Sequence, residues 1–115
     1  MISQEQTINL IELTLDDMKA QDIMKINVTE KTSIADYMFI CTGRATRHVL
    51  AIADELHAKL KEAGVEYLKI TGTENGEWAL LDCGDIIVHI MLPEIRSFYN
   101  LEELWLTDKL PIHHA

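Results

Sequence analysis

The sequence predicts a small α/β sandwich in which a mixed sheet of about five strands packs against two main helices. Three observations lead to this prediction: two stretches with apolar residues at helical spacing, one strand near residue 40 that is apolar on both faces, and a long apolar hairpin over residues 77–91. The length of 115 residues fits one domain with a single modest core.

The first helix is predicted from its cap. Ser3 followed by Gln6 is a capping-box pattern, and apolar residues then recur at helical spacing as far as Met18. We expect this helix to end near Gln21. Alternation of apolar and polar residues over Met24–Val28 then predicts a strand with one wet face, and a polar turn follows it.

The middle of the chain predicts a βαβ unit. Residues 37–42 are apolar on both faces, which indicates an interior strand covered by helices. A second helix is expected over residues 46–63, with Gly64 at the position after its C-cap. Leu68 and Ile70 mark a short strand, so a right-handed crossover between parallel strands is expected.

The stretch from Glu77 to Met91 predicts two strands joined at a Gly84–Asp85 or Cys83–Gly84 turn, because glycine tolerates the positive φ of such turns. With either turn, one face is wholly apolar and belongs to the core: Ala79, Leu81, Cys83, Ile86, Val88 and Ile90. The other face mixes aromatic, charged and aliphatic groups: Trp78, Leu80, Asp82, Asp85, Ile87, His89 and Met91. This mixed face either lies beneath another layer or meets a partner.

After Pro93 we expect one or two short helical turns, with Asn100 and Glu103 as a capping pair. We assign residues 1–106 to a single domain and residues 107–115 to a short C-terminal tail. No apolar run approaches the roughly 20 residues of a membrane span, and the N-terminus lacks a basic signal-peptide region. The expected location is therefore the cytoplasm.

The charge balance limits the class of partner. The chain carries 10 basic and 19 acidic residues, a formal net charge of −9. Phosphate binding draws its affinity from lysine and arginine, so direct nucleic-acid binding is not expected. A basic or apolar protein surface suits the chain better. Two cysteines are too few for a disulfide framework, and we expect buried, reduced thiols.

The motifs that could carry chemistry are weak. The segment from Gly43 to His48 joins a strand to a helix, where anions can bind, but a single glycine matches neither the P-loop nor the dinucleotide fingerprint. Asp82 and Asp85 flank a turn without a third carboxylate at a suitable spacing, and a lone strand histidine such as His89 is usually a hydrogen-bonded, half-buried group. We expect no metal, no cofactor and no enzymatic activity.

Several motifs, spread over nearly the whole chain, form a combination that is specific although each motif alone is weak. They are residues 35–43 (Ala-Asp-Tyr-Met-Phe-Ile-Cys-Thr-Gly), Arg47-His48, Ala53-Asp54, Trp78, Asp82, Gly84-Asp85, Val88-His89, Arg96, Tyr99, Leu101-Glu102 and Leu104-Trp105. With these motifs the chain closely resembles the Iojap-related family of bacterial ribosomal silencing factors. The resemblance implies a fold related to the nucleotidyltransferases but without a working active site. It also implies binding to the large ribosomal subunit through ribosomal protein fourteen of that subunit, which would block association with the small subunit and lower translation when nutrients are short. A homodimer of the free protein is implied as well.

The partner-binding residues that we expect are Trp78, Leu80, Asp82, Asp85, Ile87, His89, Met91, Arg96 and Tyr99. Tryptophan and tyrosine are enriched at interface hot spots. Two alternatives stay open: a protein-binding module with a non-ribosomal partner, and a divergent nucleotidyltransferase. The second would need a Gly-Ser loop and a spaced pair of aspartates, where this chain has Gly43–Arg44.

Overall fold

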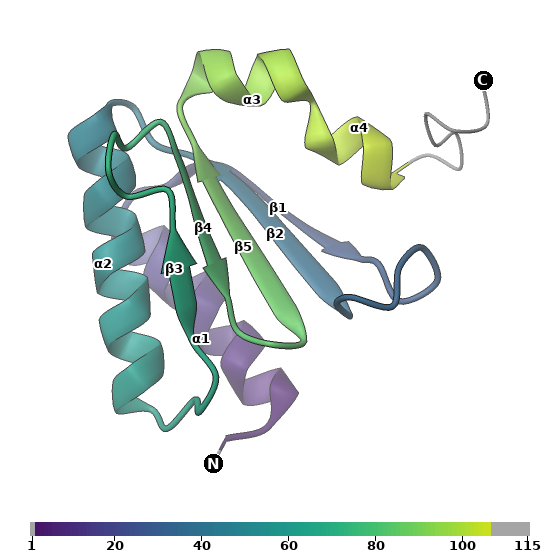
Figure 1. The fold of residues 1–115 in the computed structure, drawn as a ribbon. Helices are drawn as coiled ribbons and strands as arrows, with labels where there is room; N and C mark the ends of the chain where they lie inside the picture. The colour runs from purple at the N-terminus through teal and green to yellow at the C-terminus, as the bar shows by residue number, and fades with distance from the viewer. Residues whose placement is uncertain (1, 107–115) are drawn as a thin grey trace.

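A computed structural model describes residues 2–106, without the side chains of residues 104–106. The predicted tail over residues 107–115 and the side chains of Leu104 and Trp105 therefore lie outside the described part. Figure 1 shows the elements, which follow in chain order: α1 (Gln4–Asp17), β1 (Gln21–Asn27), β2 (Tyr37–Thr42), α2 (Thr46–Glu62), β3 (Lys69–Thr71), β4 (Trp78–Asp82), β5 (Ile86–Met91), α3 (Pro93–Tyr99) and α4 (Leu101–Leu106).

The sheet has five strands in the order β1-β2-β5-β4-β3. β2 and β5 pair in parallel, whereas the other three neighbouring pairs are antiparallel. The predicted mixed sheet is therefore confirmed. β2 and β3 run in the same direction, as the βαβ prediction requires, but β5 and β4 lie between them. The hairpin of β4 and β5, which follows the crossover in the sequence, thus separates β2 from β3 in the sheet.

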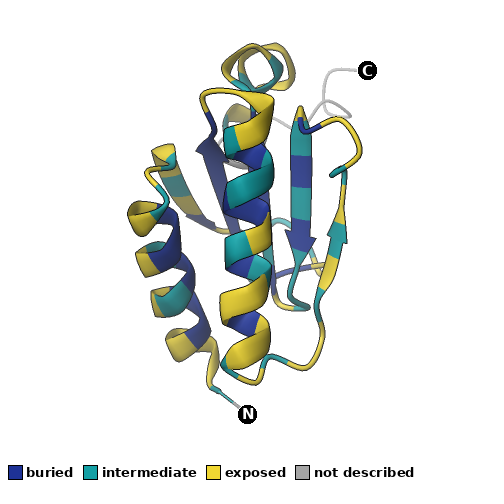
Figure 2. Ribbon diagram, turned by 90° about the vertical axis from the view of Figure 1, so that its left-hand side faces the viewer, coloured by how far each residue is buried: buried dark blue, intermediate teal, exposed yellow. Residues whose placement is uncertain are grey.

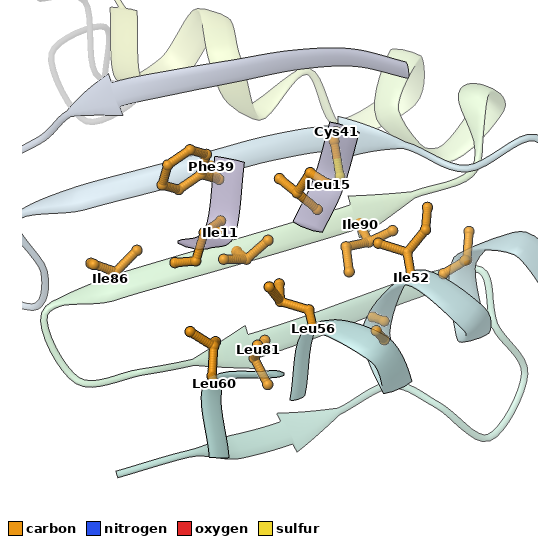
Figure 3. Close-up of a cluster of buried hydrophobic side chains, with 14 of the residues drawn as sticks. Ile11, Leu15, Phe39, Cys41, Ile52, Leu56, Leu60, Leu81, Ile86 and Ile90 are labelled. Carbon is orange, nitrogen blue, oxygen red and sulfur yellow. The ribbon is translucent and has the colours of Figure 1, made fainter. Parts of the chain in front are cut away.

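Both long helices lie on one face of the sheet, side by side, with their buried sides turned toward it (Figure 2). The main core lies between them and the strands (Figure 3). Ile11 and Leu15 of α1 contribute to it, as does the α2 stripe of Val49, Ile52, Ala53, Leu56 and Leu60. The hairpin face that was predicted to be core supplies the sheet side, with Cys83 half-buried and the others buried.

A second, smaller cluster lies on the opposite face of the sheet. Its buried members are Ile26, Val28, Ala35, Met38, Ile40 and Met91. The short helices α3 and α4 contribute Ile95 and Leu101, and Trp78 and Ile87 pack against the cluster from the sheet. The mixed face of the hairpin is thus partly covered by another layer and partly open.

The start of α1 is as predicted, because Ser3 and Gln6 form a reciprocal capping box. Its end is not. The helix stops at Asp17, not near Gln21, and β1 begins at Gln21, three residues before the predicted start. Lys19, with a φ of 60°, turns the chain between the two elements. Glycine usually marks such a left-handed position, and its absence here hid the stop signal.

The hairpin turn is Gly84–Asp85, since the Cys83 N–H donates to the carbonyl of Ile86 across it. Gly84 has a φ of 87°. Two further predictions are confirmed. Gly64 follows the C-cap of α2 with a φ of 96°. Asn100 ends α3 in the left-handed region and donates to Glu103 of α4.

Candidate interaction surface

Trp78 begins β4 on the mixed face of the sheet, two residues before Leu80, which lies opposite His89 of β5. This diagonal arrangement brings large side chains on one face within reach of each other. The Trp78 Nε1–H donates to Nδ1 of His89 over 3.0 Å. The hydrogen bond to His89 on the adjacent strand thus fixes the orientation of the Trp78 indole.

The His89 imidazole is neutral and acts as a support. It is only 6% exposed, and burial lowers its pKa from 6.5 to about 4. Because Nδ1 accepts the Trp78 hydrogen bond, the remaining ring proton is on Nε2. The prediction of a hydrogen-bonded histidine is therefore confirmed, and the group is not poised as a general base near pH 7.

An aromatic patch, defined as Trp78, Phe98 and Tyr99, extends from this pair to the surface. The ring centroids of Trp78 and Tyr99 are 4.8 Å apart, and the Phe98 ring meets Tyr99 edge-on at 5.0 Å. Phe98 is 79% exposed and Tyr99 is 52% exposed. Phe98 was not among the predicted site residues, although two adjacent aromatic residues in a short helix were a usable signal.

Arg96 anchors α3, which carries Phe98 and Tyr99 of this patch. Its Nε donates to Glu102 Oε2 over 2.8 Å, and its Nη1 donates to the backbone carbonyl of Asp22 and to Thr42 Oγ1 over 2.7 and 2.9 Å. The side chain is only 11% exposed. A single guanidinium therefore ties α3 to α4, β1 and β2, so that the position of the aromatic patch is fixed relative to the sheet.

A hollow of about 750 Å³ lies on the other side of α3. Its walls are the first residues of β1, Thr42 at the end of β2, and the turn between α3 and α4. Arg96 and Glu102 both line it. The Glu102 Oε1 atom is buried and has no hydrogen-bond partner among the groups that the structure describes, while Oε2 of the same carboxylate accepts from Arg96.

The nine predicted site residues spread along the mixed face instead of meeting at one point. Trp78, His89, Met91 and Tyr99 gather at the α3 end, where Met91 is completely buried. Leu80 and Ile87 are half-buried further along the strands. Asp82 and Asp85 lie at the hairpin turn, and an Asp82 carboxylate oxygen accepts from the Gly84 N–H. Arg96 faces the hollow.

The segment from Gly43 to His48 serves the fold. His48 Nδ1 accepts from the Arg44 N–H over 3.0 Å, and its Nε2 lies 2.8 Å from the carbonyl oxygen of Met18, to which it donates. The imidazole thus joins the end of α1 to the start of α2. Ala45 at the N-cap contributes no side-chain hydrogen bond.

Among residues 2–103, no group of three or more His, Cys, Asp or Glu side chains is arranged to hold a metal ion. Burial raises the pKa values of Cys41 and Cys83 to about 12, so both are protonated thiols at neutral pH. No helix in the described part of the chain is long and apolar enough to cross a membrane. The chain is thus a small α/β protein with an exposed aromatic patch, carried by elements that the hydrogen bonds of His89 and Arg96 hold together.

The family is identified by comparison. A family model described as "Ribosomal silencing factor during starvation" matches residues 2–114, and the chain belongs to this family. The prediction from sequence motifs is therefore confirmed. The family is named for an action on ribosomes and not for a reaction, which agrees with the prediction that the chain is not an enzyme.

The relatives agree with this assignment. A ribosomal silencing factor from Zymomonas mobilis is 46% identical over 101 residues, which cover 88% of this chain and 76% of the relative. The chloroplastic Iojap protein of Zea mays is 33% identical over 77% of this chain and 39% of its own length. A crystal structure of a Chromobacterium violaceum protein is similar with a TM-score of 0.88 and 39% identity, over 94% of this chain and 90% of that one.

Proposed function

We propose that this chain silences ribosomes in the cytoplasm by binding the large ribosomal subunit through its ribosomal protein fourteen. An occupant there would block association with the small subunit and repress translation under nutrient limitation. Family membership supports the general action. The observation that carries the binding proposal is the aromatic patch, in which Phe98 and Tyr99 are largely exposed while Trp78 packs against Tyr99 from the sheet.

The patch suits tight binding because its frame is already ordered. Aromatic side chains bury a large area with few rotatable bonds, and they dominate interface hot spots. The Trp78–His89 hydrogen bond and the three hydrogen bonds of Arg96 hold the sheet and α3 together before a partner arrives. Little further ordering is then needed on binding, which leaves more of the interaction free energy as affinity.

Each of the nine predicted residues has a role in this proposal. Tyr99 and Trp78 form the central contact, and the half-buried Leu80 and Ile87 continue it along the sheet. Asp82 and Asp85 meet basic side chains of the partner. His89 and Met91, which are buried, support the contact from below, and Arg96 fixes α3.

The net charge of −9 supports a basic protein as the direct partner. Opposite charges speed the encounter between proteins, whereas RNA phosphates would repel this chain. We also propose that the free chain is a homodimer, as the family resemblance implies. Light scattering at several protein concentrations tests this directly, and a mass of one chain at all of them would contradict it.

Co-sedimentation with purified large subunits tests the main proposal, with Tyr99→Ala as the variant. Loss of a hot-spot side chain typically costs about 2 kcal/mol or more, so we expect binding to weaken roughly thirtyfold. Tyr67→Ala is the matched control, because Tyr67 is 54% exposed and Tyr99 is 52% exposed. The control should bind as the unmodified chain does.

Thermal melts of both variants check the fold. Absence of co-sedimentation by the unmodified chain would contradict the proposed function. Equal binding by Tyr99→Ala and Tyr67→Ala would show that the aromatic patch is not the contact.

A further inference from the structure

The hollow beside α3 is lined by charged groups that the hydrogen bonds of the fold satisfy only in part. It has about the volume of a small-ligand pocket, and its lining combines Asp22, Arg96 and Glu102. Two carboxylates and one guanidinium give the lining a formal excess of negative charge. The backbone of β1 is irregular at this point, because the register with β2 shifts between Gln21 and Met24.

Arg96 does not make the hollow an anion site. Its Nε and Nη1 groups already donate to three acceptors, and its charge is compensated by Glu102 at 2.8 Å. An incoming phosphate or carboxylate would also meet the charges of Asp22 and Glu102. Like charges brought together in a partly buried site repel strongly.

Glu102 indicates the opposite kind of ligand. Within the described part of the chain only one of its two carboxylate oxygens is paired, and the buried Oε1 lacks a donor there. A buried acceptor without a donor costs about 1–3 kcal/mol relative to a paired one. The Glu102 side chain is still 20% exposed, so a donor that enters the hollow can approach this carboxylate.

We propose that the hollow receives a lysine or arginine side chain of the protein that covers the aromatic patch. α3 separates the two features, with Tyr99 on one side and Arg96 on the other, so that a single protein lying over this helix meets both. A cationic side chain supplies N–H donors to the unpaired carboxylate oxygen and balances the excess negative charge. The inference rests on the proposed function only for the identity of the protein.

The test is an NMR titration of the ¹⁵N-labelled chain with Nα-acetyl-arginine amide. We expect saturable shifts of backbone amides in residues 21–24 and 93–102. The matched neutral probe is Nα-acetyl-citrulline amide, which has nearly the same shape and should bind more weakly. Glu102→Gln and Asp22→Asn should each reduce the affinity for arginine roughly threefold or more, as expected for loss of one charge partner.

Asp54→Asn is the control, because Asp54 is an exposed aspartate of α2 that does not line the hollow. It should leave the affinity unchanged. Shifts that do not saturate, equal binding of the citrulline probe, or an equal effect of Asp54→Asn would each overturn the proposal. Asp22→Asn keeps the test valid if Glu102→Gln disturbs α4, since Arg96 is bonded to the Asp22 backbone and not to its carboxylate.

The failure of this inference is distinguishable from failure of the proposed function. If the chain binds the arginine probe at residues 21–24 and 93–102 but does not co-sediment with large subunits, the proposed function fails and the chemistry of the hollow stands. If the chain co-sediments and ignores the probe, the inference alone fails.

Discussion

The His89 imidazole sets the geometry of the aromatic patch, because its Nδ1 atom holds the indole of Trp78. This bond requires a neutral ring, and burial keeps the ring neutral by lowering its pKa to about 4. A protonated His89 would carry a hydrogen on Nδ1 and could no longer accept from Trp78. The charge state of this one buried side chain thus decides whether the hydrogen bond that holds the Trp78 indole can form.

Acid should therefore destabilise this chain through His89. Between its unfolded pKa of 6.5 and its folded pKa of about 4, the unfolded chain binds a proton that the folded chain does not. The free energy of unfolding consequently falls as the pH falls through this window, by roughly 2–3 kcal/mol at pH 4.5 from this residue. Urea unfolding measured between pH 7 and pH 4.5 gives the change.

His89→Asn is the control for this measurement. Its side-chain oxygen can accept from Trp78 near the position of Nδ1, but it does not titrate. The unmodified chain should lose more stability than the variant over the same pH range. The same pH slope in both proteins would mean that His89 is not the titrating group.

Single residues were only partly predictable from the sequence. The alternation of the hairpin correctly placed Trp78 and His89 on one face, because strand periodicity fixes faces independently of register. The alternation could not show that Met91 is buried. That burial depends on packing with α3 and α4, which the strand pattern does not contain. The three hydrogen bonds of Arg96 reach residues of three other elements, and no local pattern contains that information.

At the scale of elements, the two turns that flank β4 place different demands on glycine. Gly72 precedes β4 with a φ of 81°, and Gly84 follows it with a φ of 87°. A Cβ atom at Gly72 would overlap the backbone carbonyl oxygen of Trp78, whereas one at Gly84 would meet no atom within 4 Å. The two positions have similar positive φ angles and differ in the space around them.

Gly72→Ala should therefore destabilise the chain much more than Gly84→Ala. Both variants incur the left-handed backbone cost of about 1–2 kcal/mol. Gly72→Ala additionally forces β4 away from the turn, for which we expect at least about 1–3 kcal/mol more. Urea unfolding of the two variants measures the difference, and equal losses would show that the turn before β4 relaxes freely.

Elements whose boundaries are marked by a local sequence signal were predicted well. The capping box at Ser3 and the glycines at positions 64 and 84 each satisfy a local backbone requirement, and each marks the correct boundary. The end of α1 lacked such a residue, and its predicted position was wrong. The order of the strands was not predicted either, because the insertion of β4 and β5 between β2 and β3 is a tertiary arrangement.

For the whole molecule, the dominant long-range property is its net charge of −9. At the proposed binding site, attraction to a basic ribosomal protein and repulsion from surrounding RNA phosphates would act in opposite directions. Both are screened over about 8 Å at physiological ionic strength. The two effects partly cancel, so apolar contact through the aromatic patch should dominate the affinity.

Binding to large subunits should accordingly depend only weakly on salt. Between about 50 and 200 mM salt we expect the affinity to change by well under the roughly 10³-fold that a many-phosphate contact loses. Sedimentation at a series of salt concentrations measures this. A loss of that size, or equally strong binding to naked ribosomal RNA, would mean that the partner has been misassigned.

The parallel pairing of β2 with β5 also constrains when this fold can be completed. It joins Tyr37 to Ile86, 49 positions further along the chain, and it holds together the two halves of the sheet. While the chain is being synthesised, the apolar faces of β2 and α2 exist before the strand that covers them. The sheet can close only after residues 86–91 have been synthesised, so the first 85 residues cannot by themselves form the complete sheet.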